Sequence, residues 1–154
     1  MVNHLANGTA ALLNNPDQLA ALLADPGLGA NAAEEMLRYD APIQIMGRVA
    51  GADTEIGGLD VTAGTLLICL LGAANRDPGQ FAEPDRFDLS RTGMTALSFG
   101  GGMHYCLGAP LARMEAAAFF PALLNRFPKL AAAGEPVRRG MVFRSFEDLP
   151  ITVV

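Results

Sequence analysis

The sequence predicts a mainly α-helical fold with small β-sheets, an α+β arrangement, within its 154 residues. Three stretches near the start of the chain and one near residue 110 carry apolar residues at helical spacing. Short apolar or β-branched stretches between them are bounded by glycine and proline, as is typical of short strands. A hydrophobic content of 51% supports a buried core, and the length suits one domain.

Three helices are expected in the first part of the chain: residues 2–13, residues 17–24, and a third from near Asn31 to just before Pro42. The first helix contains His4 and Thr9, which are residue types found in catalytic sites. Neither has a recognisable partner in the sequence. We therefore interpret both as packing positions on a helix face.

Short strands are expected in the middle of the chain. An extended segment at residues 43–46 precedes strands at residues 54–56 and 65–71, and two glycines at 57 and 58 turn the chain between shorter pieces. Residues 66–71 are almost all apolar, so we expect them to be buried. Cys69 lies in this run and is interpreted as a small hydrophobic side chain.

A fourth helix is predicted over residues 109–127. Pro110 suits its first turn, and the apolar residues 107, 111, 114 and 118 recur at helical spacing. Pro121 removes a backbone hydrogen bond from the interior of this helix, so we expect a kink or a break there.

The chain is expected to end in a β-hairpin. Its strands are placed at residues 141–143 and 151–154, with a turn through residues 145–148. Phe143 and Phe146 are expected to belong to the core rather than to a site.

Charge and cysteine usage exclude several classes of function. A net charge of −5 and a pI near 4.9 disfavour nucleic acid and anionic membranes as partners. The sequence has no signal-peptide pattern and no run of 18 apolar residues. Its two cysteines lie far apart and form no disulfide framework, so a cytoplasmic location is expected.

The stretch from Phe99 to Gly108 is the most informative part of the sequence. It is a glycine-rich loop that places Cys106 just before the predicted helix at residue 109. Free backbone N–H groups and the helix dipole at that end favour a thiolate over a thiol. The three glycines at 100–102 remove side chains from the approach, so the loop can lie against a large flat group.

Five positions of this loop fit the pattern F-x-x-G-x-H-x-C-x-G: Phe99, Gly102, His104, Cys106 and Gly108. The pattern resembles the haem-ligand loop of the cytochrome P450 family of haem-thiolate monooxygenases. Two further motifs of that family occur in the expected order, E-x-x-R at residues 35–38 and P-x-R-F at residues 84–87.

The resemblance implies that residues 1–154 form a single partial domain, the C-terminal haem-ligand part of the cytochrome P450 fold. The N-terminal helices and most of the helix over the distal haem face would be absent. Its expected order is the end of the distal helix, the E-x-x-R helix, small strands and the meander loop. The cysteine loop, its following helix and the C-terminal hairpin complete it.

The resemblance also implies a haem b cofactor with Cys106 as its axial ligand. His104 and Arg48 match residues that hold the haem propionates, and Phe99, Gly100 and Gly108 would line the ring beside the sulfur. Glu35, Arg38 and Arg86 would form a buried structural triad. Without the family, Glu35 and Arg38 could be only a surface pair one helical turn apart.

The sequence allows two roles each for the residues of the extended segment and for Arg113. The extended segment could place Ile43, Ile45 and Met46 in a substrate pocket wall, or it could be an ordinary buried strand. Arg113 could lie on the surface where an electron donor docks, or it could be a solvated helix charge.

The function implied for the full enzyme is insertion of one oxygen atom of O2 into a small apolar substrate, with electrons from a ferredoxin or reductase. The acid-threonine pair that manages protons in the family would fall just upstream of Met1, so no catalytic residue is assigned in this chain. Two alternatives stay open. One is a stand-alone haem binder with peroxide-driven oxidation, and the other is a haem-free, non-enzymatic remnant that forms a homodimer through an exposed apolar face.

Overall fold

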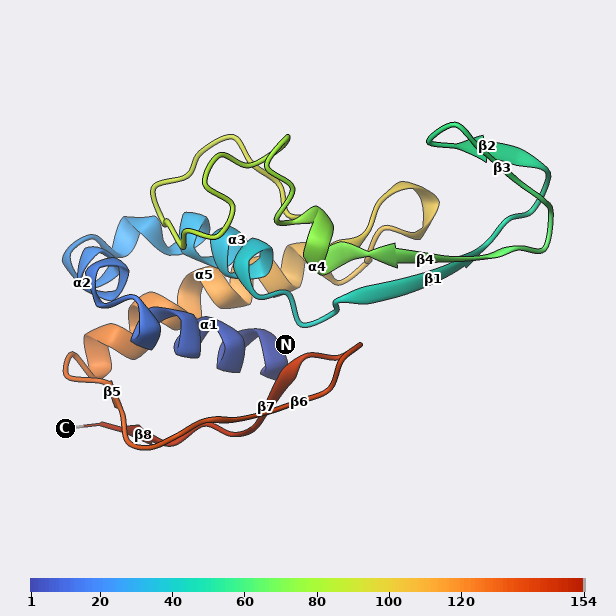
Figure 1. The fold of residues 1–154 in the computed structure, drawn as a ribbon. Helices are drawn as coiled ribbons and strands as arrows, with labels where there is room; N and C mark the ends of the chain where they lie inside the picture. Colours follow the sequence, from blue (N-terminus) through green and yellow to red (C-terminus); the bar gives the residue numbers. More distant parts are fainter. Residues whose placement is uncertain (154) are drawn as a thin grey trace.

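A computed structural model describes residues 1–153, in which helices pack together and two-stranded sheets lie outside them (Figure 1). The α-helices are α1 (Val2–Asn14), α2 (Pro16–Ala24), α3 (Gly29–Tyr39), the single turn α4 (Leu71–Ala74) and α5 (Ala109–Arg126). Three 3-10 turns are η1 (Pro26–Leu28), η2 (Leu97–Phe99) and η3 (Gly102–His104). The expected α+β class is confirmed.

The core lies where α3 packs against both α1 and α5, with α2 at one end. Its largest apolar side chains include Leu12, Leu22, Met36, Phe120 and Leu124, each almost fully buried. The four main helices lie close to their expected positions, although α3 begins earlier, at Gly29. None of the helices described is long and apolar enough to cross a bilayer.

Helix α5 runs without interruption through Pro121, so the expected break is absent. The start of α3 packs closely against this part of α5. A Cβ on Gly29 would lie 2.5 Å from the Ala117 carbonyl oxygen, which is the oxygen that Pro121 leaves without its helical donor. The glycine therefore allows the two helices to approach at the point where α5 lacks a hydrogen bond.

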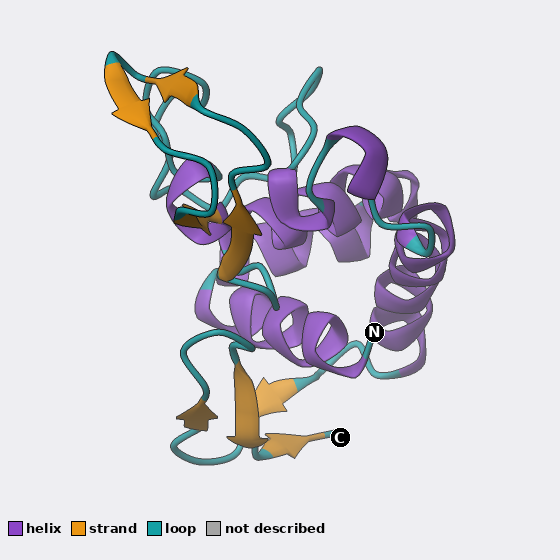
Figure 2. Cartoon of the chain, turned by 90° about the vertical axis from the view of Figure 1, so that its right-hand side faces the viewer, coloured by secondary structure: helices purple, strands orange, loops and turns teal. Residues whose placement is uncertain are grey.

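The sheets are pairs of antiparallel strands at the edges of the helical core (Figure 2). The pairs are β1 (Ile45–Val49) with β4 (Leu66–Leu70), β2 (Thr54–Ile56) with β3 (Leu59–Val61), β5 (Ala131–Ala132) with β8 (Ile151–Thr152), and β6 (Val137–Arg139) with β7 (Ser145–Asp148). The β1–β4 pair joins α3 to α4 and extends away from the core, and β2–β3 lies at its far end.

The expectation that residues 66–71 are buried is wrong for most of the strand. Leu66, Ile68 and Leu70 are each more than half exposed, and Cys69 is also exposed. The strand pairs only with β1, and two strands alone cannot cover their own faces. Leu66, Ile68 and Leu70 lie on one face with Val49, which is 65% exposed.

The apolar spacing in α5 identified a helix but not its buried face. Leu107 is 98% exposed, and Leu111 and Met114 are mostly exposed. The side chains that α5 buries are instead those of Ala116, Phe120 and Leu124, which face α1 and α3.

The C-terminal hairpin lies elsewhere than expected. Residues 145–148 form strand β7 rather than a turn, and the chain reverses between Gly140 and Arg144. Gly140 has φ +78°, and a Cβ there would collide with the carbonyl oxygen of Phe143. Phe143 is exposed rather than in the core, and Phe146 is half-buried beneath the Arg138 guanidinium. Val154, the last residue of the expected hairpin, lies outside the described residues.

Substitution of Gly8 by alanine tests the packing of the helical core. A Cβ at this position would lie 2.5 Å from Phe120 Cζ and 2.6 Å from Met36 Sδ. We expect Gly8→Ala to lower the free energy of unfolding by about 1–3 kcal/mol through overpacking, although alanine is the better helix former. Gly51→Ala, where a Cβ meets no atom within 4 Å, is the control and should change stability little. Chemical denaturation measures both, and an unchanged or stabilised Gly8→Ala would contradict the packing described.

Candidate functional site

The Cys106 loop is held in a tight backbone conformation that leaves the sulfur accessible. The Cys106 amide donates to the Phe99 carbonyl at 3.0 Å, which closes the loop, and the Tyr105 amide donates to Gly102 at 3.1 Å. Gly100 and Gly102 have φ values of +71° and +66°, which only glycine adopts readily. The Cys106 side chain is exposed, two residues before the Gly108 N-cap of α5.

A largely apolar cavity of about 210 Å³ lies beside this sulfur. Its lining residues are Met1, His4, Leu37, Pro42, Ile43, Met46, Ser98, Phe99, His104, Cys106 and Ala112. Of the three candidate pocket residues in the extended segment, Ile43 and Met46 line this cavity. Ile45 does not, because alternation along β1 turns it to the other face, where it lines a second hollow with Leu70.

Of the two candidate propionate ligands, His104 lines the cavity, from the cysteine loop, and Arg48 does not. Arg48 lies on β1 two residues after Met46, so both side chains belong to the same face of the strand. Its guanidinium donates to the neighbouring Gly47 carbonyl at 2.8 Å and has no carboxylate partner among residues 1–153.

The glycines of the loop leave room for a large flat group next to the sulfur. A Cβ on Gly108 would lie 3.8 Å from Cys106 Sγ, and one on Gly100 would lie 3.7 Å from the terminal methyl of Met46. Side chains on Gly101 or Gly102 would project into open space. An exposed soft sulfur donor, an apolar wall and side-chain-free backbone are the features that a haem-thiolate site requires.

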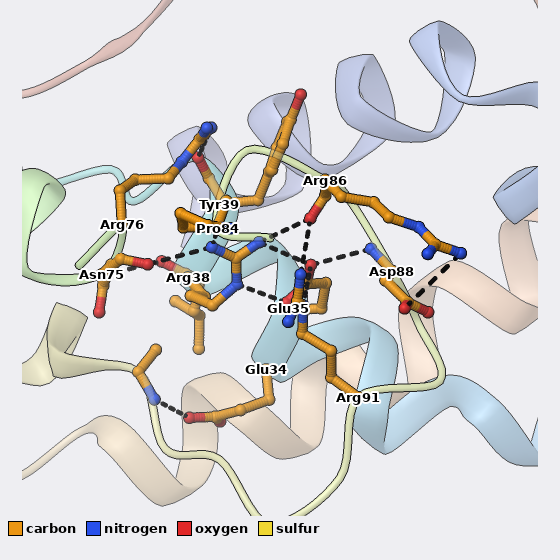
Figure 3. Close-up of polar contacts among 12 residues, drawn as sticks. Glu34, Glu35, Arg38, Tyr39, Asn75, Arg76, Pro84, Arg86, Asp88 and Arg91 are labelled. Carbon is orange, nitrogen blue, oxygen red and sulfur yellow. Dashed lines mark hydrogen bonds and ion pairs between the residues drawn. The ribbon is translucent and has the colours of Figure 1, made fainter. Parts of the chain in front are cut away.

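The Glu35–Arg38 pair is a fully buried network rather than a surface pair (Figure 3). Arg38 Nε and Nη2 donate to the two carboxylate oxygens of Glu35 at 2.7 and 2.8 Å. The remaining donors of Arg38 reach the carbonyls of Asn75 at 3.0 Å, Pro84 at 2.7 Å and Arg86 at 2.9 Å. All five N–H donors of the guanidinium are therefore satisfied.

The third side chain of this network belongs to Arg91 and not to Arg86, where it was expected. Arg91 Nε lies 3.3 Å from Glu35 Oε1, and its other nitrogens donate to the carbonyls of Ala82 and Glu83. The Arg86 side chain is 57% exposed and pairs with Glu83 and Asp88. Arg86 enters the network through its carbonyl alone, because the loop turns its side chain outward (Figure 3).

Arg113 is neither a free docking charge nor a solvated one. Its Nε and Nη2 bind Glu34 at 2.6 and 3.0 Å, and its Nη1 donates to the Tyr105 hydroxyl at 2.6 Å. The guanidinium carbon lies 4.8 Å from the centre of the Phe99 ring. Its hydrogen bond to Glu34 raises the pKa of Arg113 further, so the charge is permanent.

Two residues of the site gave little signal in the sequence. Glu34 precedes the recognised Glu35 and reads as one more helix-surface carboxylate. Asn75 is fully buried, accepts from the Leu97 amide at 2.7 Å and donates to Ser98 at 2.9 Å, so it anchors the start of the cysteine loop. Its position at the end of α4, directly before Arg-Asp-Pro, is the only local signal.

His4 packs in the core, as expected, but it also reaches the cavity wall. Its ring meets Phe120 edge-on, and neither ring nitrogen has a hydrogen-bond partner among the residues described. Burial, followed by the positive charge at the Met1 amine, lowers the pKa of His4 from 6.5 to about 4. Thr9 is satisfied within α1 by the Leu5 carbonyl and is a packing residue.

The fold and the cysteine loop are those of the haem-thiolate class of proteins that the sequence resembles, and comparison with known proteins identifies the family. The family model described as "Cytochrome P450" matches residues 30–138. The chain belongs to the cytochrome P450 family.

Curated relatives and solved structures match almost the whole chain but extend far beyond it. The biotin biosynthesis cytochrome P450 of Bacillus subtilis is 44% identical over 98% of this chain and 39% of its own length. The 6-deoxyerythronolide B hydroxylase of Saccharopolyspora erythraea is 43% identical, over 97% and 38%. P450BioI, crystallised with an acyl carrier protein carrying hexadec-9Z-enoic acid, superposes with a TM-score of 0.95 at 44% identity, over 99% of this chain and 40% of that one. The chain thus spans about two fifths of the length of these relatives.

Arginine substitutions distinguish the two candidates for the third position of the network. Arg91→Met removes a guanidinium from the buried Glu35 carboxylate and should lower the free energy of unfolding by about 1–3 kcal/mol. Arg86→Met is the matched control, because its exposed side chain contributes less than about 1 kcal/mol and its carbonyl stays in place. Urea denaturation measures both. A larger loss for Arg86→Met would restore the triad inferred from the sequence.

The pH dependence of stability tests the environment of His4. Between pH 6.5 and about 4 the unfolded chain protonates this imidazole and the folded chain does not, so folding is progressively disfavoured as the pH falls. The full effect is about 3 kcal/mol. We expect His4→Leu to reduce the loss of unfolding free energy between pH 7 and pH 4 by up to that amount. Chemical denaturation at each pH gives the unfolding free energy of both proteins. If the two proteins lost the same unfolding free energy between pH 7 and pH 4, with equal denaturant m-values, the burial of His4 in its neutral form would be contradicted.

Proposed function

We propose that this chain binds haem b through the Cys106 thiolate and forms the cofactor-holding part of a monooxygenase. The observation that carries the proposal is the exposed Cys106 sulfur on a glycine-lined loop beside an apolar cavity, in a chain of the cytochrome P450 family. Each neighbouring side chain has a defined part in holding the cofactor.

His104 lines the cavity from the cysteine loop, and Arg48 belongs to the same face of β1 as the lining residue Met46. Both would donate charge-assisted hydrogen bonds to the haem propionates. Phe99 lines the cavity next to Cys106 and would exclude water from the sulfur side. Gly100 and Gly108 would let the backbone approach the ring, because no Cβ stands between the loop and the cofactor.

Haem held by a cysteine thiolate supplies the cleavage of the O–O bond, and the full enzyme inserts one oxygen atom of O2 into its substrate. Backbone amides following Cys106 would donate to the sulfur and tune its electron release. Ile43 and Met46 form an apolar wall that suits a small apolar substrate. Electrons would come from a ferredoxin or a reductase.

The ligands of two solved relatives bear on the choice of substrate. One relative was solved with a fatty acyl carrier protein and another, from Mycobacterium smegmatis, with econazole, yet both match this chain at 44–45% identity. Proteins that share this part of the fold therefore hold different ligands. The choice of substrate depends on more than the residues present here.

Haem titration of matched cysteine variants tests the proposal. Wild-type protein and Cys69→Ser should both bind hemin, and after reduction with dithionite and addition of carbon monoxide both should show the thiolate-type difference band. Cys106→Ser should lose that band, because serine provides no thiolate. Cys69 is the right control, since it is the other exposed cysteine and lies on a different element.

A wild-type protein that stays colourless with hemin would support the haem-free remnant instead. A band that survives in Cys106→Ser would exclude this residue as the ligand. Turnover with a redox partner and O2, compared with turnover on hydrogen peroxide, then separates the monooxygenase from a peroxide-driven oxidant.

A further inference from the structure

The residues between Phe99 and Cys106 have very few contacts that hold them in place. Gly101 through Gly108 are all exposed, so burial of apolar surface contributes little to their order. Asn75 and Ser98 fix the chain only up to residue 98. Among the described residues, Arg113 is the one side chain outside the loop that hydrogen-bonds a residue between 99 and 106.

The Arg113 guanidinium contacts both ends of this segment at once. It donates to the Tyr105 hydroxyl at 2.6 Å and lies over the Phe99 ring at 4.8 Å. These two residues flank the hydrogen bond from the Cys106 amide to the Phe99 carbonyl that closes the loop. A planar group with donors along two edges and two open faces suits this double contact, and an ammonium group does not.

Glu34 fixes the direction of that guanidinium. Its carboxylate accepts two hydrogen bonds from Arg113, and Oε1 also accepts from the Ala96 amide at 2.7 Å. The pair is largely buried, with side chains 15% and 26% exposed. One carboxylate on α3 therefore links Ala96, immediately before η2, to α5, the helix that follows the cysteine.

We propose that Glu34 and Arg113 are positioning residues that hold the Cys106 loop closed and so keep the sulfur directed at the haem iron. The pair does not line the cavity and acts through Phe99 and Tyr105. This inference rests on the proposed haem-thiolate function, and it has a consequence for the haem-free protein that can be tested separately.

Amide hydrogen exchange of the haem-free protein tests the loop itself. In Arg113→Gln, exchange at the Tyr105 and Cys106 amides should accelerate roughly tenfold, the effect of losing a charge-assisted hydrogen bond. Arg113→Lys should behave like the glutamine variant, because lysine keeps the positive charge but lacks the planar guanidinium that contacts Glu34, Tyr105 and Phe99 together. Arg126→Gln, an exposed arginine on the same helix, is the control and should match wild type.

The haem-loaded protein supplies the second readout. The carbon monoxide complex of reduced Arg113→Gln and Arg113→Lys should convert from the thiolate-type to the neutral-thiol-type spectrum roughly tenfold faster than wild type. Tyr105→Phe removes only the hydrogen bond from Arg113 to the Tyr105 hydroxyl. It should also accelerate the conversion to the neutral-thiol-type spectrum, and it should leave folding unchanged because the ring is exposed. The haem reduction potential should shift in these variants and not in Arg126→Gln.

The outcomes separate the two levels of the proposal. If Arg113→Lys matched wild type in both readouts, charge rather than geometry would be the role, and the positioning function would be wrong. Equal exchange in Arg113→Gln and Arg126→Gln would overturn it as well. If wild type took up no haem, the proposed function would fail, while the exchange rates of the haem-free proteins would still decide whether the pair holds the loop.

Discussion

The buried ion pair between Glu35 and Arg38 is the interaction on which the irregular segment from Asn75 to Arg91 depends. Both side chains are inaccessible to solvent, and a buried charge pair is tolerated only when its remaining hydrogen-bonding groups are satisfied. Three of those partners are backbone carbonyls, of Asn75, Pro84 and Arg86. Satisfying the Arg38 charge therefore fixes the path of an irregular segment that contains little regular structure of its own.

Two consecutive glutamates let one helix organise two separate loops. Adjacent residues of an α-helix point about 100° apart, so Glu35 faces the loop that carries Arg91 while Glu34 faces α5 and the cysteine loop. Helix α3 is itself fixed in the core against α1 and α5. The meander loop, which carries Arg91, and the loop that presents the sulfur are thus both held to α3. Their relative placement follows from the geometry of this helix.

Local signals in the sequence predicted the helices, the strand positions near β2 and β4, and the loop that presents Cys106. These features depend on residues close together in the chain. The sequence did not reveal that Arg91 rather than Arg86 meets Glu35. The two arginines lie only five residues apart, and the path of the loop alone decides which side chain points inward. The burial of residues 66–71 was mispredicted for a related reason, and the apolar spacing of α5 did not indicate which of its faces is buried. An apolar residue is buried only where an element from elsewhere in the chain covers it, and the local spacing of apolar residues does not show which element that is.

The cysteine loop differs from the helical core in what holds it together. The core is stabilised by apolar side chains such as Phe120 and Leu124, whereas the residues around Cys106 are exposed and include glycines that add no packing. Order in such a segment must come from directed polar contacts, and those contacts end on Glu34 and Asn75, side chains of the buried polar framework. The direction of the sulfur therefore depends on directed hydrogen bonds that begin at Glu34 on α3 and pass through Arg113 to the loop. A flexible, glycine-rich loop can then present a ligand in one orientation while leaving its face free for a flat cofactor.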